Sequence, residues 1–279
     1  MVEFKYNINK FTLWQLAAGP IIILLLCLVF LSITTISTGF PMKPGVDFAG
    51  GTEVTLSRVY TEEEVLSQFS SFPLQTVQGQ ILRFNPMSDE QYNELTQNLS
   101  TFDRDATINR IDPIFGQNLQ TLAVYALIAS FIGMSIVVFV SFRTFVPSGA
   151  VILSAFADIV MTAATMNILG IALSLGTTAA LLMLIGYSVD SDILLTTRVI
   201  KRKGKIEEKF SGAFRTGIVM TSTTMAAVAA MWVVSILGSI QVIAEIASVL
   251  FIGLIFDIFN TWLTNAGLLK WYTEKRGEK

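Results

Sequence analysis

Two aspartates, Asp190 and Asp192, lie near the end of an apolar stretch that runs from Gly176 to Thr197. As a helix, this stretch is long enough to cross the hydrocarbon core of a bilayer at about 1.5 Å per residue. An aspartate at the centre of such a helix costs about 2.5–3.5 kcal/mol on insertion, so acids there usually serve an ion pathway or have a buried partner. The chain contains no histidine. Proton chemistry would therefore use carboxylates, hydroxyls and water.

Three further acids, Asp158, Glu245 and Asp257, lie in other apolar stretches. We expect protonation of Asp158 or Asp190 to alternate with access from the two sides of the membrane, because intramembrane acids are functional by default. The alternative is that the acids are neutral, hydrogen-bonded links between helices or to a partner subunit. For Glu245 and Asp257 we favour this structural role.

The spacing of small residues suggests which acids face the helix bundle. A small residue stands four positions before three of them, in the pairs Ser154–Asp158, Gly186–Asp190 and Gly253–Asp257. Positions four apart share a helix face, and a small residue there allows a neighbouring helix to approach closely. Asp190 and Asp192 are separated by about 200° of helix rotation and face opposite ways. We therefore predict that Asp190 faces inward.

A run of hydroxyl side chains in another apolar stretch could complement these acids. It consists of Thr221, Ser222, Thr223 and Thr224, and Arg215 stands six residues before it. Hydroxyl-rich helices pack in bundle interiors, where they can hydrogen-bond a carboxylic acid. Arg215 would pair with an acid or lie among lipid phosphates, and both possibilities stay open.

Composition and hydropathy supply the elements that hold these residues. With 279 residues, 52% hydrophobic and 14% charged, the chain is predicted to be an α-helical, polytopic membrane protein. We predict six transmembrane helices, at Leu13–Ser37, Leu119–Phe142, Pro147–Asn167, Gly176–Thr197, Gly217–Leu237 and Val242–Leu269. The domains are then the first helix with the amino terminus (1–37), an external segment (38–118), the remaining bundle (119–269) and a tail (270–279).

Basic residues predict the orientation of the chain. Fourteen of the 19 lysines and arginines fall on one side of this six-helix arrangement, among them Lys5, Lys10, Lys279 and the dense group from Arg198 to Arg215. The short loops on the other side, near Gly170 and at Gly238-Ser239, contain none. Both termini are predicted to be cytoplasmic and residues 38–118 external, in a cell membrane.

The external segment has the pattern of a small α/β domain. Residues 53–57 alternate like a half-buried strand, and capping boxes at Thr61 and Ser88 open two helices. Residues 76–84, interrupted by Gly79, and residues 106–111 read as two more strands. The predicted order is β-α-β-α-β, between the first and second transmembrane helices.

Several function classes are excluded by absence of their motifs. We find no glycine-rich phosphate loop, no hydrolase elbow and no cluster of metal ligands, so we expect no enzyme, cofactor or metal site. The single cysteine, Cys27, excludes an intrachain disulfide. The external segment has eleven acids and five basic residues, which does not suggest nucleic-acid binding. The basic cytoplasmic group reads most simply as a topology signal, with anionic lipid or a partner as the alternative.

Six segments in order along the chain resemble the SecF family of protein-export membrane proteins, within the RND-type superfamily. They are PGVDFAGGTEVTL from Pro44, which includes Gly45, Asp47, Gly50 and Gly51, RIDPIFGQNL from Arg110, FADIVMT from Phe156, LIGYSVDSDILLTTRVIKR from Leu184, RTGIVMTSTT from Arg215 and GLIFDIFNTWLTNAGLLKWY from Gly253. The chain looks like the archaeal members.

The resemblance implies a function in protein export. It implies a half-transporter that partners SecD, a homologous six-helix half, beside the Sec translocation channel in the lipid bilayer. Bacterial members are taken to use the proton gradient to pull exported polypeptides outward. By position, Asp158 matches the third-helix acid of the family and Arg215 the fifth-helix arginine.

This chain departs from the family pattern at one position. The bacterial fourth-helix acid follows an asparagine in a GYSxND arrangement, and alignment on Gly186-Tyr187-Ser188 puts Ser191 in its place, flanked by Asp190 and Asp192. The offset of one residue is about 100° of helix rotation. Two other functions stay open: a purely structural subunit of the translocation complex, and a self-assembling RND-type exporter of lipids or small hydrophobic molecules.

Overall fold

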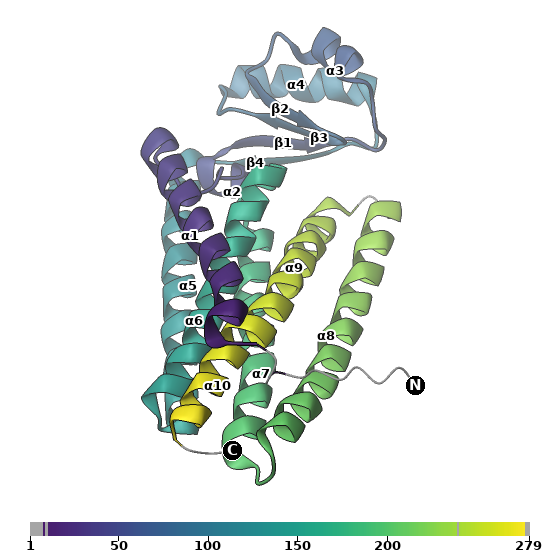
Figure 1. Ribbon diagram of the computed structural model, residues 1–279. Helices are drawn as coiled ribbons and strands as arrows, with labels where there is room; N and C mark the ends of the chain where they lie inside the picture. Colours follow the sequence, from purple (N-terminus) through teal and green to yellow (C-terminus); the bar gives the residue numbers. More distant parts are fainter. Residues whose placement is uncertain (1–7, 9–10, 239, 277–279) are drawn as a thin grey trace.

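Six long helices and a small sheet domain make up the fold. The structure is a computed structural model that describes residues 8, 11–238 and 240–276. Within these residues, six helical spans are long and apolar enough to cross a membrane, as predicted (Figure 1). They are α1 (Leu13–Thr38), α5 (Pro113–Phe142), α6 (Phe145–Leu169), α7 (Leu175–Lys201), α8 (Ile206–Leu237), and a last span of α9 (Gln241–Phe259), a π-helical segment η2 (Asn260–Asn265) and α10 (Ala266–Lys275). Lys5, Lys10, Ser239 and Lys279 lie outside the described residues.

Several helices extend beyond the apolar stretches that predict them. Helix α5 begins six residues earlier than expected, because the side chain of Asp112 accepts a hydrogen bond from the Ile114 amide and Pro113 occupies the first helical position. Helix α8 begins at Ile206, eleven residues before the predicted span that starts at Gly217, and includes Lys209 and Arg215. Hydropathy marks only the apolar part of a helix, and these polar ends continue it.

Helix α7 lies at the centre of the bundle. It packs against α5, α6, α8 and α9, while α1 packs on the outside against α6, η2 and α10. Helix α8 stands at the edge of the bundle and contacts α7 and α9 (Figure 1). A carboxylate on α7 can therefore reach groups on most of the other spans.

The sheet domain contains one more strand than predicted. Residues 76–84 do not form one strand, because Gly79 takes a positive φ of 60° and turns the chain, leaving two strands joined by a two-residue loop. The elements are β1 (Gly51–Thr55), α3 (Glu62–Phe69), β2 (Leu74–Gln78), β3 (Ile81–Phe84), α4 (Asp89–Phe102) and β4 (Thr107–Ile111). The sheet is antiparallel, in the order β2-β3-β1-β4. Both predicted capping boxes are present, at Thr61 and Ser88.

The two faces of this sheet have different neighbours. Helices α3 and α4 cover the face that points away from the membrane helices (Figure 1). The apolar core between them includes Val54, Phe69, Leu82, Phe84 and Leu95. The other face is directed toward the bundle, which allows polar side chains of the sheet to contact the ends of the spans.

The predicted glycine motif fastens the sheet domain to the bundle. The Gly45 amide donates to the Leu173 carbonyl at 2.7 Å, and Asp47 Oδ2 accepts from the Leu175 amide at 2.9 Å, at the start of α7. The short helix α2 (Val46–Ala49) follows. Gly50 and Gly51 have φ of 75° and 123°, and a Cβ on either would meet backbone of Pro113 or Phe84. Only glycine allows this crossing.

A second attachment is an ion-paired group under the sheet. Arg83 Nε lies 2.8 Å from Glu53 Oε2, and Arg83 Nη2 lies 3.4 Å from Glu245 Oε1 on α9. Glu245 thus connects α9 to the sheet domain as a member of an ion pair, and not as the neutral, hydrogen-bonded acid that we expected. We call Glu53, Arg83 and Glu245 the ion-pair triad.

Candidate functional site: a buried carboxylate cluster

Asp158 lies on α6 and is completely buried. Ser188 Oγ on α7 donates to its Oδ2 at 2.5 Å, and Asn260 Nδ2 in η2 donates to its Oδ1 at 2.6 Å. Both carboxyl oxygens therefore have a partner, and the side chain joins three spans.

Asp192 on α7 is also completely buried, but only one of its oxygens is satisfied. Its Oδ1 accepts from Asn265 Nδ2 at 2.7 Å and lies 2.9 Å from Thr261 Oγ1. Its Oδ2 makes no hydrogen bond of normal geometry with the described residues, although the Ser154 hydroxyl of α6 lies close enough to interact with this carboxyl. A buried polar atom without a well-placed partner is costly, so this oxygen is the least satisfied atom of the site.

Thr261 connects Asp192 to a third acid. Its Oγ1 lies 2.9 Å from Asp192 Oδ1 and 3.1 Å from Asp257 Oδ1. A hydroxyl carries a single hydrogen, whereas an ionised carboxylate can only accept. Both contacts are hydrogen bonds only when one of the two carboxyl groups is protonated and donates to the threonine oxygen.

The charge balance of the cluster leads to the same conclusion. Asp158, Asp192 and Asp257 are close enough to interact electrostatically, and each is at most 1% exposed. Among the described residues, no ion pair within 4.0 Å includes any of them. Since like charges without a cation cannot all be kept in a buried site, the three acids share at least one proton.

The π-helical segment presents the amides and hydroxyl of this cluster. Asn260, Thr261 and Asn265 all lie in η2, and all are fully buried. A π-helical turn accommodates one more residue than an α-helical turn and is frequent at functional sites. The segment allows its first, second and sixth residues to reach Asp158 on α6 and Asp192 on α7.

The inward-facing acid of α7 is Asp192, so the prediction of Asp190 is wrong. Asp190 is exposed, as is Gly186, whose missing side chain would point into open space. The two aspartates do face opposite ways. Ser191, at the family's acid position, is buried and lies against Asp257. Small residues four positions before an acid occur on lipid-facing surfaces as well, so the spacing alone could not select the face.

The hydroxyl run of α8 does not complement the acids. Thr223 and Thr224 donate to the Met220 carbonyl in their own helix at 2.8 and 3.1 Å, Ser222 is exposed, and Thr221 is buried. The side chains that hydrogen-bond the acids lie on α7 and in η2 instead. Arg215 is exposed on α8.

Sequence reasoning missed the amides and the hydroxyl of η2. A signal was present, because Asp257, Asn260, Thr261, Thr264 and Asn265 recur at helical spacing in an otherwise apolar stretch. That pattern marks a polar face directed into the bundle. It also includes Asp257, for which the sequence favoured a purely structural role and which lies within the cluster.

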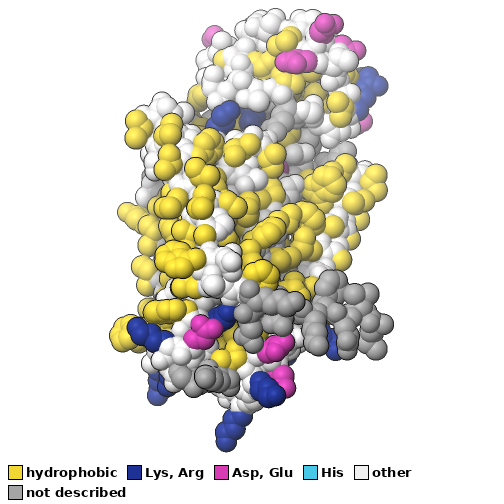
Figure 2. Space-filling model, in the orientation of Figure 1, with side chains coloured by type: hydrophobic (Ala, Val, Ile, Leu, Met, Phe, Trp, Pro, Cys, Tyr) yellow, Lys and Arg dark blue, Asp and Glu magenta, His cyan; other side chains and the backbone are white. Residues whose placement is uncertain are grey.

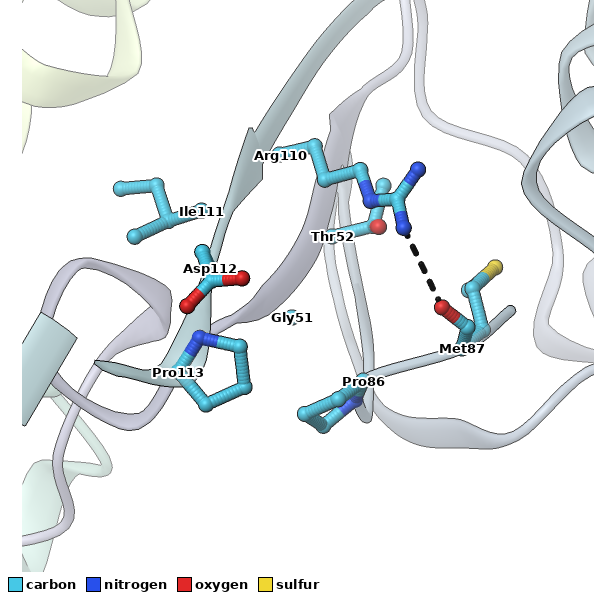
Figure 3. A pocket seen from close by; sticks show the side chains of 8 residues that line it. All are labelled: Gly51, Thr52, Pro86, Met87, Arg110, Ile111, Asp112 and Pro113. Carbon is cyan, nitrogen blue, oxygen red and sulfur yellow. Dashed lines mark hydrogen bonds between the residues drawn. The ribbon is translucent and has the colours of Figure 1, made fainter. Parts of the chain in front are cut away.

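A separate pocket of about 300 Å³ lies beside β4 in the sheet domain (Figure 3). Its charged groups are already engaged in the fold. Arg110 donates to the Met87 carbonyl at 3.3 Å and pairs with Asp89 at 2.9 Å, and Asp112 caps α5. Arg110 therefore acts within the sheet domain, and Asp112 marks the junction with α5.

Comparison with known proteins agrees with this architecture. The family description "Protein export membrane protein SecD/SecF, C-terminal" matches residues 91–275, and "SecD/SecF GG Motif" matches residues 35–57. The protein-export membrane protein SecF of Methanolacinia petrolearia is 51% identical over 100% of both chains. That of Haloferax volcanii is 43% identical over 98% of both.

A solved structure has the same fold at low identity. It is that of SecDF, a translocon-associated membrane protein from Thermus thermophilus, with a TM-score of 0.72 and 23% identity. The match covers 92% of this chain and 37% of the SecDF chain. At this identity the likeness concerns the fold alone. The full-length relatives and both family matches show that this chain is a multi-pass membrane protein of the SecD/SecF family of protein-export proteins.

Proposed function

We propose that this chain works with a separate SecD half beside the Sec translocation channel, assists late translocation or membrane insertion of exported polypeptides, and draws on an ion gradient, most simply of protons. Full-length relatives carry the description "protein-export membrane protein SecF". Because the chain spans 37% of the SecDF chain whose fold it shares, a second chain would supply the other half.

The proposed orientation places both termini in the cytoplasm and the sheet domain outside. Lys and Arg side chains are frequent at the end of the bundle opposite the sheet domain, below a broad apolar band (Figure 2). The group from Arg198 to Lys205 lies at this end, where α7 gives way to α8. The positive-inside rule assigns such an end to the cytoplasm.

The observation that carries the proposal is the Thr261 hydroxyl shared by Asp192 and Asp257. A proton that arrives on Asp192 allows the single threonine hydrogen to turn toward Asp257, and its departure reverses the preference. The contact joins α7 to the last span, so protonation changes which helices are held together. Each charge moved across the membrane provides about 2.3 kcal/mol per 100 mV. No covalent bond is made or broken.

A structural role is the second candidate, and Asp158 favours it. Both oxygens of this acid accept hydrogen bonds, from α7 and from η2. A satisfied, buried carboxyl of this kind can join helices without exchanging its proton. The proposal therefore assigns proton exchange to Asp192 and Asp257 and helix joining to Asp158.

Export into inside-out vesicles tests the proposal. The vesicles carry this chain with SecD, and export of a reporter polypeptide is compared with and without a proton gradient, or a sodium gradient in its place. We expect Asp192→Asn and Asp257→Asn to remove the gradient-dependent part while SecD still copurifies. Asp190→Asn, two residues away on the exposed face of α7, is the matched control and keeps it.

Each alternative has its own outcome. If all three variants export like the wild type, the cluster is structural and the chain is a scaffold. If the dependence follows the sodium gradient, the coupled ion is not the proton. If SecD does not copurify with the wild type, the chain is not the half of a two-chain assembly.

A further inference from the structure

A cleft of about 400 Å³ lies between α7 and α8, near the end of the bundle opposite the sheet domain. One wall is apolar and consists of Ile193, Leu194 and Met220, and Met220 is 42% exposed. The other end is basic, with Arg198 and Arg202. Along α7, the cleft begins at Asp190, passes this apolar wall and ends at the two arginines, so an apolar surface adjoins a cationic one as acyl chains adjoin headgroups in a membrane.

Arg198 has hydrogen-bonding capacity left over. Its Nη1 donates to the Gly212 carbonyl of α8, which fixes the guanidinium between the two helices. Its Nε is buried and has no partner among the described residues. A buried donor of this kind is costly, so the described residues leave the contact between α7 and α8 at Arg198 incomplete.

The described residues leave a net positive charge around Arg198. The guanidinium of Arg202 is close enough to repel that of Arg198. A smaller hollow of about 140 Å³ adjoins the cleft, shares both arginines and adds Lys203. The described acids that line the two spaces are Asp190 and Glu208. Planar guanidinium groups such as those of Arg198 and Arg202 suit phosphate oxygens in particular.

We propose that this cleft binds one anionic membrane phospholipid. Its phosphate accepts from Arg198 and Arg202, and one of its chains lies along Ile193, Leu194 and Met220. A soluble phosphate would satisfy the basic end and leave the apolar wall uncovered, which is why the lipid is favoured. A general topology signal explains basic residues at this end, but it requires neither a cleft nor a buried, unpartnered Nε. The proposal does not depend on ion coupling.

Lipid binding to the purified full-length chain provides the test. The chain is reconstituted into nanodiscs of phosphatidylcholine, and native mass spectrometry follows retention of added phosphatidylglycerol. We expect wild type to retain phosphatidylglycerol, and Arg198→Gln with Arg202→Gln to weaken retention about tenfold or more, since charged hydrogen bonds are lost. The matched control, Lys275→Gln with Arg276→Gln, removes two cations from α10 and retains the lipid as wild type does.

Further arms separate the lipid from other occupants. Arg202→Gln alone keeps the Arg198 contact with Gly212 and so preserves the fold, and it is expected to weaken retention by a smaller factor. Excess inorganic phosphate should not displace the lipid. The proposal would be overturned if the two double variants retained phosphatidylglycerol equally, if phosphatidylcholine bound equally well, or if inorganic phosphate alone displaced the lipid. It would also be overturned if no lipid were bound and a copurifying protein protected Arg198 and Arg202 from arginine-modifying reagents.

Discussion

The last span carries a polar group near each end of α9, partly buried toward the sheet domain and fully buried deeper in the bundle, and the two differ in their charge balance. Near the sheet domain, Glu245 and Glu53 share the guanidinium of Arg83. Deeper in the bundle, Asp257 interacts electrostatically with Asp192 and Asp158, and no described cation forms an ion pair with any of the three. An acid beside a fixed cation keeps its charge, whereas acids that have only one another must share protons. The first group can act as a mechanical link, and the second can respond to a proton gradient.

Because of this difference, the ion-pair triad and the carboxylate cluster contribute to the stability of the fold in different ways. The triad depends on a charge that cannot be removed at ordinary pH, because arginine stays protonated. The cluster depends on neutral hydrogen bonds, which tolerate an amide in place of an acid. Mutations of the two regions should therefore differ in size and in kind.

The largest effect is expected from Arg83→Ala. This change leaves Glu53 and Glu245 partly buried beside each other without a cation, which costs about 3–5 kcal/mol of folding free energy. Thermal unfolding of the full chain in detergent measures the loss. Arg110→Ala is the control, because its pair with Asp89 is exposed and is worth at most about 1 kcal/mol. If the two variants lost the same free energy of unfolding, the triad would contribute no more to stability than an exposed ion pair.

A smaller loss is expected from Asn260→Leu. The change removes the 2.6 Å hydrogen bond to Asp158 Oδ1 and leaves that oxygen buried without a donor, at a cost of about 1–3 kcal/mol. The same unfolding measurement applies. Asn167→Leu, whose amide makes longer hydrogen bonds of 3.3 and 3.5 Å, should cost less. A larger loss at Asn167 would contradict the assignment of Asp158 as a helix-joining group.

The sheet domain contains a further carboxylate, Asp103, whose charged form is stabilised by hydrogen-bond donors. Burial raises the pKa of Asp103, but hydrogen bonds from Ser57 and the Asp105 amide outweigh it and hold the pKa below its ordinary value. Its stabilisation is therefore complete above pH about 4, the unfolded pKa, and is lost as the pH falls through the folded pKa.

We accordingly expect Asp103→Asn to destabilise the chain by about 1 kcal/mol at pH 7 and by less at pH 3. The difference in unfolding temperature between wild type and variant, measured at both pH values, is the observable. A difference that grows on acidification would show that the sign of the shift is wrong.

The smallest loss of stability is expected from Asp192→Asn, at about 1 kcal/mol or less. An amide replaces a neutral acid of the same shape, accepts from Asn265 and, like the protonated acid, has a hydrogen to donate to Thr261. Glu245→Gln, which removes a charge from the triad, should cost more. If Asp192→Asn were the more costly of the two, Asp192 would be ionised in the folded chain and the comparison would fail.

Much of the scaffold could be predicted from local sequence. Apolar stretches predicted the six spans, and the capping boxes at Thr61 and Ser88 predicted α3 and α4, because both signals depend on neighbouring residues alone. The hairpin at Gly79 was missed because a glycine inside a strand pattern can mark a bulge as well as a turn.

The site could be predicted only in part. The acids were visible because a charge in an apolar stretch is conspicuous, but the choice between Asp190 and Asp192 depends on which face of α7 meets α6 and η2. The role of Asn260, Thr261 and Asn265 depends on a π-helical segment, whose register no regular period of hydrophobic residues indicates. Both are set by tertiary packing.

The central claim is that the cluster holds a shared proton at neutral pH. Infrared spectroscopy of the reconstituted chain reports it directly, because a protonated carboxyl has a carbonyl stretch that an ionised carboxylate lacks. We expect a buried protonated-carboxyl band at pH 7 that Asp192→Asn or Asp257→Asn diminishes and Asp190→Asn leaves unchanged. Absence of that band in wild type, or its loss in Asp190→Asn alone, would contradict the claim.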